Sequence, residues 1–201
     1  MINQYRPVKK RVKEFVPGHQ MTADEYILQW RKGKAWEHLT RPVHQKRLNW
    51  CSDQCLGESF LDVGCAFGHS TAIMKTRHPG KWFGVDFSVM AIAEALALFP
   101  DIQFSYLKEI WEIMNLTIFD SVVCSEVIEH VPDPSALLAA MTTIARKRII
   151  ITTPTRDAQD PGHVRLYDLA SLEVLLKDYP HTISMDENFF YATVEMSRCE
   201  Y

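Results

Sequence analysis

Two patterns of hydrophobic and polar positions alternate along most of the chain. Short apolar runs typical of buried strands are each followed by a segment in which apolar residues recur at helical spacing. The runs that predict strands cover residues 59–63, 81–87, 102–107, 119–125, 148–153, 181–186 and 189–197. The segments that predict helices after the strands cover residues 71–77, 89–99, 108–115, 135–146 and 168–178. We therefore expect an α/β fold with a doubly wound, mostly parallel, seven-stranded sheet.

The ends of several elements carry local signals. The segment His78-Pro79-Gly80 breaks the first of these helices. Ser88 is the expected N-cap of the next helix, which Pro100 ends. The dipeptide Glu187-Asn188 joins the last two runs as a hairpin. That hairpin would place one antiparallel strand in the sheet.

The region before the first strand has a different organisation. Its spacing is helical from about Thr22 to Trp50, and Thr22-Ala23-Asp24-Glu25 resembles a capping box that starts a helix. Residues 51–58 are rich in turn formers and predict a linker. We therefore divide the chain into a basic tail over residues 1–20, a helical cap over residues 21–58 and a main domain over residues 59–201.

The composition sets limits on the class of protein. With 201 residues, of which 47% are apolar and 23% charged, the chain fits one globular domain with its own core. Its five cysteines, an odd number without framework spacing, indicate a reducing compartment. The sequence contains no apolar stretch of about 18 residues and no secretory signal. We expect a cytoplasmic protein without a membrane span.

Charge is uneven along the chain. Residues 1–20 contain five basic side chains and one acid, whereas the whole chain has a net charge of −3. A basic tail of this kind can hold a nucleic acid or an acidic partner. A solvated tail without a partner is the simpler interpretation.

The turn after the first strand has the composition of a ligand-binding loop. In an open parallel sheet, ligands bind beyond the carboxyl ends of the strands. Within the segment from Phe60 to Ser70, Gly64 allows a tight turn and Gly68 opens the next helix, whose amides favour an anionic group. Asp86 ends the second strand, where an acid can accept both hydroxyl protons of a ribose. The loop and the acid together predict a nucleotide-like ligand.

Three segments resemble the class I methyltransferases that use S-adenosylmethionine (SAM). They are Leu61-Asp62-Val63-Gly64-Cys65-Ala66-Phe67-Gly68, Gly84-Val85-Asp86-Phe87-Ser88, and the stretch 119–132 with Glu126-Val127-Ile128-Glu129-His130-Val131-Pro132. The order of elements matches that family over about residues 59–198. The resemblance implies a Rossmann-like methyltransferase fold. It also implies an enzyme that transfers a methyl group to an oxygen or nitrogen of a small or medium-sized acceptor.

The resemblance further implies which residues bind SAM. It places Asp62 and Gly64 beside the methionine part, and Asp86 on the ribose hydroxyls. Phe87 and the Leu107–Lys108 region would surround the adenine. The expected cofactor-binding residues are Asp62, Gly64, Cys65, Ala66, Gly68, Asp86, Phe87, Leu107, Lys108, Ser125 and Glu126.

Two positions depart from the family's pattern. Ala66 stands where a glycine is often found, which is tolerable if the residue keeps an ordinary backbone conformation. No Asp follows the third strand, where many relatives have an acid that contacts the adenine amino group. Backbone groups near residues 107–109 would have to take that role.

A second group of polar residues predicts chemistry on the acceptor side. Glu126, Glu129 and His130 follow the fourth strand, and His163 lies in the loop after the fifth. Both loops leave the same edge of a parallel sheet, so the four side chains can converge. Carboxylates and imidazoles that lie close together can bind a divalent metal or move a proton.

This group resembles two subfamilies of methyltransferase. The O-methyltransferases of ubiquinone biosynthesis have a similar Glu-x-x-Glu-His-Val-Pro stretch. In the small-RNA 3′-end 2′-O-methyltransferases, two Glu and two His bind a magnesium ion. Three interpretations therefore stay open: a magnesium site made by Glu126, Glu129, His130 and His163; a catalytic role for His130, Glu126 or His163 without metal; or hydrogen bonds that only orient the loop.

Other functions fit parts of the pattern. A nicotinamide-dependent dehydrogenase needs Gly-x-Gly-x-x-Gly, a spacing that residues 64–69 lack. An RNA ribose methyltransferase fits the four-residue set and the basic tail, but not the acidity of the remaining chain. A small-molecule acceptor is therefore the expected partner, with nucleic acid as the alternative. A hypothesis of another class is a SAM-binding protein that acts as a partner without turnover.

Cysteines and aromatic residues add weaker candidates. Cys51, Cys55 and His44 lack the fourth ligand of a structural zinc site. Cys65 and Cys124 fit small buried positions better than nucleophiles. Tyr26, Trp30 and Trp36 fit either an aromatic lid over a substrate or core contacts, which are more common at helical spacing. The remaining candidates for contacts with a substrate are Tyr5, Arg31, His38 and Tyr167.

Overall fold

A computed structural model describes residues 22–32, 39–156, 160 and 162–197 of the chain. The predicted basic tail and the candidates Tyr5, Trp36 and His38 lie outside the described residues. The helices are α1 (Ala23–Lys32), α2 (Pro42–Gln54), α3 (His69–Arg77), α4 (Val89–Leu98), η2 (Ile110–Asn115), α5 (Pro134–Ile144) and α6 (Leu169–Leu176). The strands are β1 (Ser59–Val63), β2 (Lys81–Asp86), β3 (Gln103–Tyr106), β4 (Phe119–Ser125), β5 (Ala145–Pro154), β6 (His181–Met185) and β7 (Phe189–Glu195).

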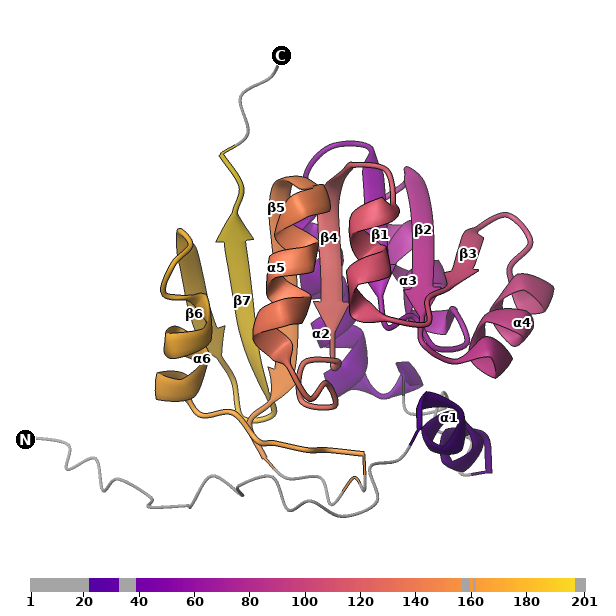
Figure 1. Cartoon of the computed structure of the whole chain (residues 1–201), viewed down its shortest axis with the longest axis horizontal. Helices are drawn as coiled ribbons and strands as arrows, with labels where there is room; N and C mark the ends of the chain where they lie inside the picture. The colour runs from indigo at the N-terminus through magenta and orange to yellow at the C-terminus, as the bar shows by residue number, and fades with distance from the viewer. Residues whose placement is uncertain (1–21, 33–38, 157–159, 161, 198–201) are drawn as a thin grey trace, which may run out of the picture.

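The strands form one sheet in the order β3-β2-β1-β4-β5-β7-β6 (Figure 1). The first five pair in parallel, and β7 runs antiparallel to both β5 and β6. This arrangement confirms the predicted α/β fold and its terminal hairpin. The chain leaves β1 toward β2 on one side, whereas β4 pairs on the other, so the carboxyl end of β1 lies at the point where the strand order reverses.

Each face of the sheet has its own hydrophobic core. On one face, Leu61 and Val122 pack with residues of η2, α5 and α6, among them Ile113, Leu137 and Leu172. On the other face, side chains of β1 and β4 pack with α2, α3 and α4, and the central members are Phe60, Val123, Leu48, Met74 and Ile92. In Figure 1, α5 lies in front of the sheet while α2 and α3 lie behind it. Burial on both faces explains why the strands are continuous apolar runs.

Local signals set the helix starts as predicted. The Ser88 hydroxyl accepts a hydrogen bond from the backbone N–H of Ala91, which caps α4. Before α1, the Thr22 hydroxyl accepts from the Glu25 backbone N–H, and the Thr22 backbone N–H donates to the Glu25 carboxylate. These two bonds form the expected capping box.

The predicted linker over residues 51–58 is wrong in its first half, because α2 continues to Gln54. The reason is burial. Leu48, Cys51, Ser52 and Cys55 follow one another at helical spacing, and all four are buried. Their face of α2 packs in the same core as Phe60 of β1, and that packing outweighs the turn-forming tendency of the local sequence. The helical spacing of these residues indicates that the helix continues, although the turn-forming residues of segment 51–58 favour a linker.

No described helix is both long and apolar enough to cross a membrane.

Candidate active site

The loop between β1 and α3 is shaped by two glycines in the left-handed conformation. Gly64 has a φ of 77° and Gly68 a φ of 78°, values that other residues rarely adopt. A Cβ on Gly64 would lie 2.4 Å from the Val127 side chain, and one on Gly68 would lie 2.7 Å from the Phe104 ring. The backbone N–H groups of Gly64 and Cys65 donate to the carbonyl of Val85. The loop is therefore fixed to the end of β2.

Ala66 departs from the expectation that it keeps an ordinary conformation. Its φ is 46°, which places it in the left-handed region. Its backbone N–H donates to Oδ2 of Asp86 over 2.9 Å. This bond to a charged acceptor opposes the cost of the conformation, which is about 1–2 kcal/mol for a residue with a Cβ.

Asp86 ends β2 beside this loop and is 8% exposed. Its Oδ2 accepts from Ala66, and its Oδ1 accepts from the backbone N–H of Ser88 over 2.8 Å. Burial raises the pKa of Asp86 to about 6, against the effect of these backbone hydrogen bonds. Each carboxylate oxygen can accept a further hydrogen bond, so the geometry suits a diol whose two hydroxyls donate to one acid.

Asp62 lies on β1, where it is 2% exposed. Its Oδ2 accepts from the hydroxyls of Thr71 and Ser70, over 2.6 and 3.3 Å. Burial raises the pKa of Asp62 to about 7. The residue therefore ties β1 to the first turn of α3 and brings a carboxyl group to the carboxyl end of β1.

The residues expected around an adenine follow β2 and β3. Phe87 is partly buried against the core, and Leu107 is buried with its backbone N–H bonded to the carbonyl of Asp86. The side chain of Lys108 is exposed. Its backbone N–H donates to the Glu112 carboxylate over 2.6 Å. The N–H of Lys108 is thus already engaged within the chain.

The end of β4 brings Ser125 and Glu126 to the same edge. Ser125 shares a hydrogen bond with the hydroxyl of Thr152 on β5 over 2.8 Å. Glu126 has a φ of 60°, a strained value for a residue with a side chain. Its backbone N–H donates to the carbonyl of Thr152, so the β4–β5 ladder holds Glu126 in that conformation.

Arg47 of α2 is the site residue that the sequence patterns missed. It is 3% exposed, and its Nη1 lies 3.2 Å from Oε2 of Glu126. Burial lowers the pKa of Arg47, while nearby acidic groups, Glu129 and Asp62 among them, oppose that effect. Nη1 of Arg47 is thus engaged in the ion pair, whereas Nε of Arg47 and Oε1 of Glu126 have no hydrogen-bond partner among the described residues. Buried polar atoms of this kind are normally paired, so they indicate a missing polar group.

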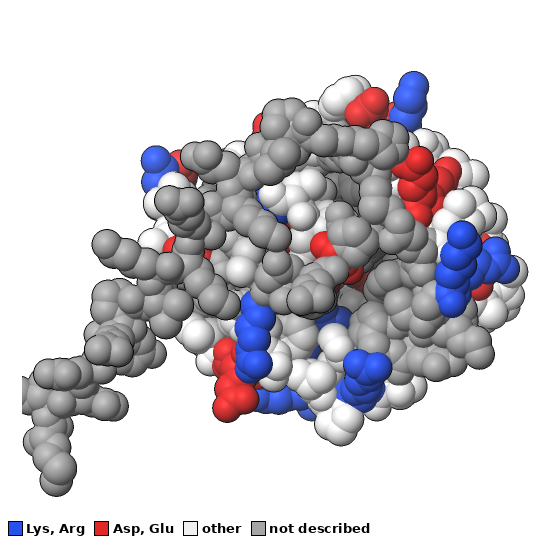
Figure 2. Space-filling model, turned by 90° about the horizontal axis from the view of Figure 1, so that it is seen from below, with Lys and Arg blue, Asp and Glu red and all other residues white. Residues whose placement is uncertain are grey.

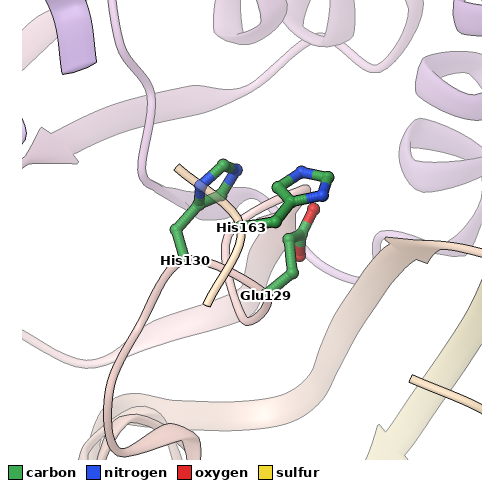
Figure 3. Close-up of side chains that lie close together, drawn as sticks. All are labelled: Glu129, His130 and His163. Carbon is green, nitrogen blue, oxygen red and sulfur yellow. The ribbon is translucent and has the colours of Figure 1, made fainter. Parts of the chain in front are cut away.

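A second cluster of polar side chains lies in the loops after β4 and β5 (Figure 3). Glu129, His130 and His163 each offer one ligand atom, and these atoms lie within 4.8 Å of one another. The two imidazole rings meet edge to face with their centroids 4.7 Å apart. Glu129 is fully buried; its Oε2 accepts from the Thr153 hydroxyl over 3.1 Å, and Oε1 has no hydrogen-bond partner among the described residues.

Backbone hydrogen bonds bring the two halves of this cluster together. The backbone N–H groups of Val164 and Arg165 both donate to the carbonyl of Glu129, over 3.0 and 3.3 Å. The Arg165 guanidinium also donates to the carbonyl of Pro132. The loop after β5 is thus bound to the loop after β4, which places His163 beside Glu129.

Burial dominates the electrostatics of the cluster. It raises the pKa of Glu129 above its usual range, which makes this carboxylate a stronger base. It lowers the pKa of His130 below its usual range, and the neighbouring His163 adds to that effect. His130 is therefore neutral at pH 7, the form that can accept a proton or bind a metal.

The predicted four-residue set is not assembled in full. The cluster contains Glu129, His130 and His163 but not Glu126, which pairs with Arg47 instead. No other group of metal-ligand residues is found in the described part of the chain. Cys51 and Cys55 lie in the core, where burial raises the pKa of both thiols.

Of the other weak candidates, Arg31 and Tyr167 have described side chains, whereas the side chains of Tyr26 and Trp30 lie outside the described part of the chain. Arg31 forms an ion pair with Glu94 over 3.6 Å, and Tyr167 is buried beside the core. Cys65 and Cys124 are buried, and burial raises the pKa of each thiol, so they stay protonated at neutral pH.

Figure 2 looks onto the edge where the parallel strands end. The acidic and basic side chains that the structure describes are interspersed on this face rather than gathered by sign. A phosphate backbone favours a continuous basic surface. The described part of this face therefore does not present such a continuous basic surface.

Comparison with known proteins assigns the chain to a family. A model of the methyltransferase domain matches residues 35–182. A ubiquinone biosynthesis O-methyltransferase of Aeromonas salmonicida is 29% identical over 171 residues, which make up 79% of this chain and 69% of the relative. One of Albidiferax ferrireducens is 32% identical over 117 residues, or 53% of this chain and 46% of the relative. The chain thus spans about half to two thirds of the length of these relatives.

Solved methyltransferases share the fold. The N-methyltransferase NodS of Bradyrhizobium japonicum, in complex with S-adenosyl-L-homocysteine (SAH), aligns with a TM-score of 0.64 and 17% identity over 87% of this chain and all of that one. Magnesium protoporphyrin IX methyltransferase of Synechocystis with bound SAM aligns with a TM-score of 0.61 and 15% identity over 90% of this chain and all of that one. The strand order, the conformation of the loop after β1 and the family match all indicate the same fold. The chain belongs to the methyltransferase domain family and is a class I SAM-dependent methyltransferase.

Proposed function

We propose that this enzyme methylates an oxygen atom of a small or medium-sized acceptor that lies against Glu129, His130 and His163. The observation that carries the proposal is the buried oxygen Oε1 of Glu129, which has no hydrogen-bond partner among the described residues, in a carboxylate that forms a cluster of metal-ligand groups with His130 and His163. A hydroxyl acceptor must lose its proton around the time of attack, whereas a neutral amine does not. The relatives that are named O-methyltransferases support the same choice.

The residues of the cofactor side fit SAM. Asp86 would offer its two carboxylate oxygens to the ribose hydroxyls, and the left-handed glycines of the loop over residues 64–68 would let the backbone approach the ligand closely. The Nε–H donor of Arg47, which lacks a partner among the described residues, fits one oxygen of the carboxylate of the methionine part, because hydrogen bonds between charged groups are strong. When SAM is bound, its sulfonium supplies an activated methyl group. The protein then has to align the acceptor with that carbon.

The acceptor side fits either a base or a metal. As a base, Glu129 would take the hydroxyl proton on Oε1, and its raised pKa helps that transfer. As ligands, one carboxylate and two imidazoles suit a transition metal such as Zn²⁺ better than Mg²⁺, which prefers oxygen ligands alone. A metal bound there would lower the pKa of a coordinated hydroxyl.

Two other functions remain as outcomes of experiment. Methylation of an RNA ribose would use the same cluster, but the interspersed charges of Figure 2 favour a smaller acceptor. A partner protein without turnover would need SAM binding alone. The cluster of Glu129, His130 and His163 would then have no use.

A methyl-transfer assay tests the proposal. The purified full chain is incubated with SAM labelled on its methyl group and with a catechol, a phenol, an aromatic amine or a short RNA with a free 3′ end. We expect label in the catechol or the phenol. Label in the amine or the RNA alone would contradict O-methylation of a small acceptor. SAH binding without transfer to any of the four would favour the partner protein.

A further inference from the structure

The turn between β6 and β7, residues 186–189, lies at the same edge of the sheet as the cofactor loop. The reason is topological: β7 runs antiparallel, so it begins where the parallel strands end, and Phe189 pairs with Pro154 at the end of β5. We call residues 186–189 the hairpin turn. The sequence pattern of this turn indicates only a connection between two strands.

The hairpin turn contacts Arg47 through an aromatic ring. The guanidinium carbon of Arg47 lies 5.0 Å from the centroid of the Phe189 ring, and Phe189 is 4% exposed. A cation over an aromatic face is attracted by the ring's quadrupole, most strongly where water is excluded. The described partners of this buried guanidinium are the ring and the carboxylate of Glu126. The ring therefore bears directly on where the guanidinium lies.

The same turn also fixes the helix that carries Arg47. Oδ2 of Asp186 lies 2.8 Å from Nζ of Lys46, the neighbour of Arg47 on α2, and accepts from the Tyr191 hydroxyl over 2.9 Å. Oδ1 of Asp186 accepts from the backbone N–H groups of Asn188 and Phe189. One carboxylate thus links the conformation of the turn to the position of α2.

We propose that Phe189 and Asp186 are positioning residues of the cofactor site, which hold the guanidinium of Arg47 in place for the carboxylate of SAM. This proposal rests on the proposed function, in which Arg47 binds that carboxylate. It assigns to the terminal hairpin a part in cofactor recognition. If the Phe189 ring served only the hydrophobic core, its removal would lower the affinity for ligands with and without the carboxylate by the same factor.

Two ligands separate these roles. SAH has the amino-acid part of the cofactor, whereas 5′-methylthioadenosine has the adenosine and the sulfur but no carboxylate. Calorimetry measures both with the wild type and with Phe189→Leu, which keeps an apolar side chain but removes the ring. We expect SAH affinity to fall about 3- to 30-fold and 5′-methylthioadenosine affinity to change less than twofold. Phe189→Tyr keeps the ring and should restore most of the SAH affinity.

A double-mutant cycle tests whether Phe189 acts through Arg47. In an Arg47→Met background, Phe189→Leu should cause no further loss of SAH affinity, because the charge that it positions is gone. Asp186→Asn keeps the side-chain oxygen but weakens the ion pair with Lys46. It should reduce SAH affinity about 2- to 3-fold, again with a smaller change in 5′-methylthioadenosine affinity. Asp186→Asn serves as the second test if Phe189→Leu fails to fold.

Phe119→Leu is the matched control, because Phe119 is a buried ring at the opposite end of β4, packed against Phe83. It should lower thermal stability without changing the ratio of the affinities for SAH and 5′-methylthioadenosine. Equal loss of both ligands in Phe189→Leu, or no loss of either, would overturn the positioning role alone. A wild type that binds neither ligand would instead contradict the proposed function.

Discussion

The two halves of the site differ in how their polar groups are satisfied. On the cofactor side, both oxygens of Asp86 accept backbone N–H groups, and Asp62 accepts two hydroxyls of α3. On the acceptor side, Oε1 of Glu129 is buried without a hydrogen-bond partner among the described residues. The first half is fixed in shape before a ligand arrives. The second half has capacity left for an acceptor or an ion.

The difference follows from chain connectivity. Asp62 and Asp86 bond to residues within ten positions or to the neighbouring strand's loop, so short stretches of sequence build the cofactor side. The acceptor side joins the loops after β4 and β5 through the carbonyl of Glu129. Arg47, which pairs with Glu126, comes from a helix far upstream and is a long-range contribution to the cofactor side. Variants of the two halves should therefore change different quantities, turnover for one and cofactor affinity for the other.

The largest effect is expected for Glu129→Gln. The change keeps size and removes the charge that a base or a metal ligand needs, so turnover should fall about 10²- to 10⁴-fold while SAH affinity changes less than twofold. Turnover and calorimetry on the same preparation measure this. Glu173→Gln, an exposed acid paired with His181, is the control. A parallel loss of SAH affinity would show that the two halves are not separate.

The second effect is on the cofactor side. Asp86→Ala removes an acceptor for the ribose and the partner of the Ala66 N–H, so SAH affinity should fall about 100-fold or more, since hydrogen bonds to charged groups contribute about 1.5–3 kcal/mol each. Calorimetry gives the dissociation constants. Asp101→Ala removes an exposed acid that pairs with Lys75 and should leave affinity unchanged. An Asp86→Ala protein with unaltered SAH affinity would remove this residue from the cofactor site.

The cofactor side should also respond to pH. Burial raises the pKa of Asp86 to about 6, and only the ionised carboxylate accepts both ribose hydroxyls. Affinity that depends on the ionised form is present above this pKa and is lost as the pH falls through it. We expect SAH affinity to be steady above pH 7 and to fall toward about tenfold per unit below pH 6. The Asp86→Asn protein should bind SAH more weakly and lose the part of the pH dependence that comes from Asp86, while any part that comes from Asp62 stays. Equal pH profiles of SAH affinity for the wild type and Asp86→Asn would contradict the assignment.

This contrast also explains what the sequence could predict. The strands, the cap at Ser88 and the two glycines of the loop after β1 depend on local pattern. The seven predicted strands, the cap and the left-handed glycines are present, although β5 begins three residues earlier than predicted. Arg47 could not be assigned a role, because its place depends on how α2 packs across the sheet. The sequence also could not show that Glu126 pairs with Arg47 rather than with the metal-ligand group, because that pairing depends on the same packing of α2. The sequence indicates which loops meet, but side-chain pairing between them depends on tertiary contacts.

The smallest effect tests the left-handed conformation of Ala66. Ala66→Gly should relieve the left-handed conformation that Asp86 imposes on the loop, a gain of about 1–2 kcal/mol. The greater freedom of glycine in the unfolded chain offsets about 0.4–1 kcal/mol of that gain. We therefore expect a rise in Tm of about 2 °C, measured by thermal unfolding.

Gly64→Ala is the matched opposite, because its φ is 77° and a Cβ would lie 2.4 Å from Val127. It should lower Tm by several degrees, since strain and overpacking each cost about 1–3 kcal/mol. If Ala66→Gly lowered Tm as well, the loop would not hold Ala66 in the left-handed conformation. The backbone bond between Ala66 and Asp86 would then not be what shapes the cofactor side before SAM binds.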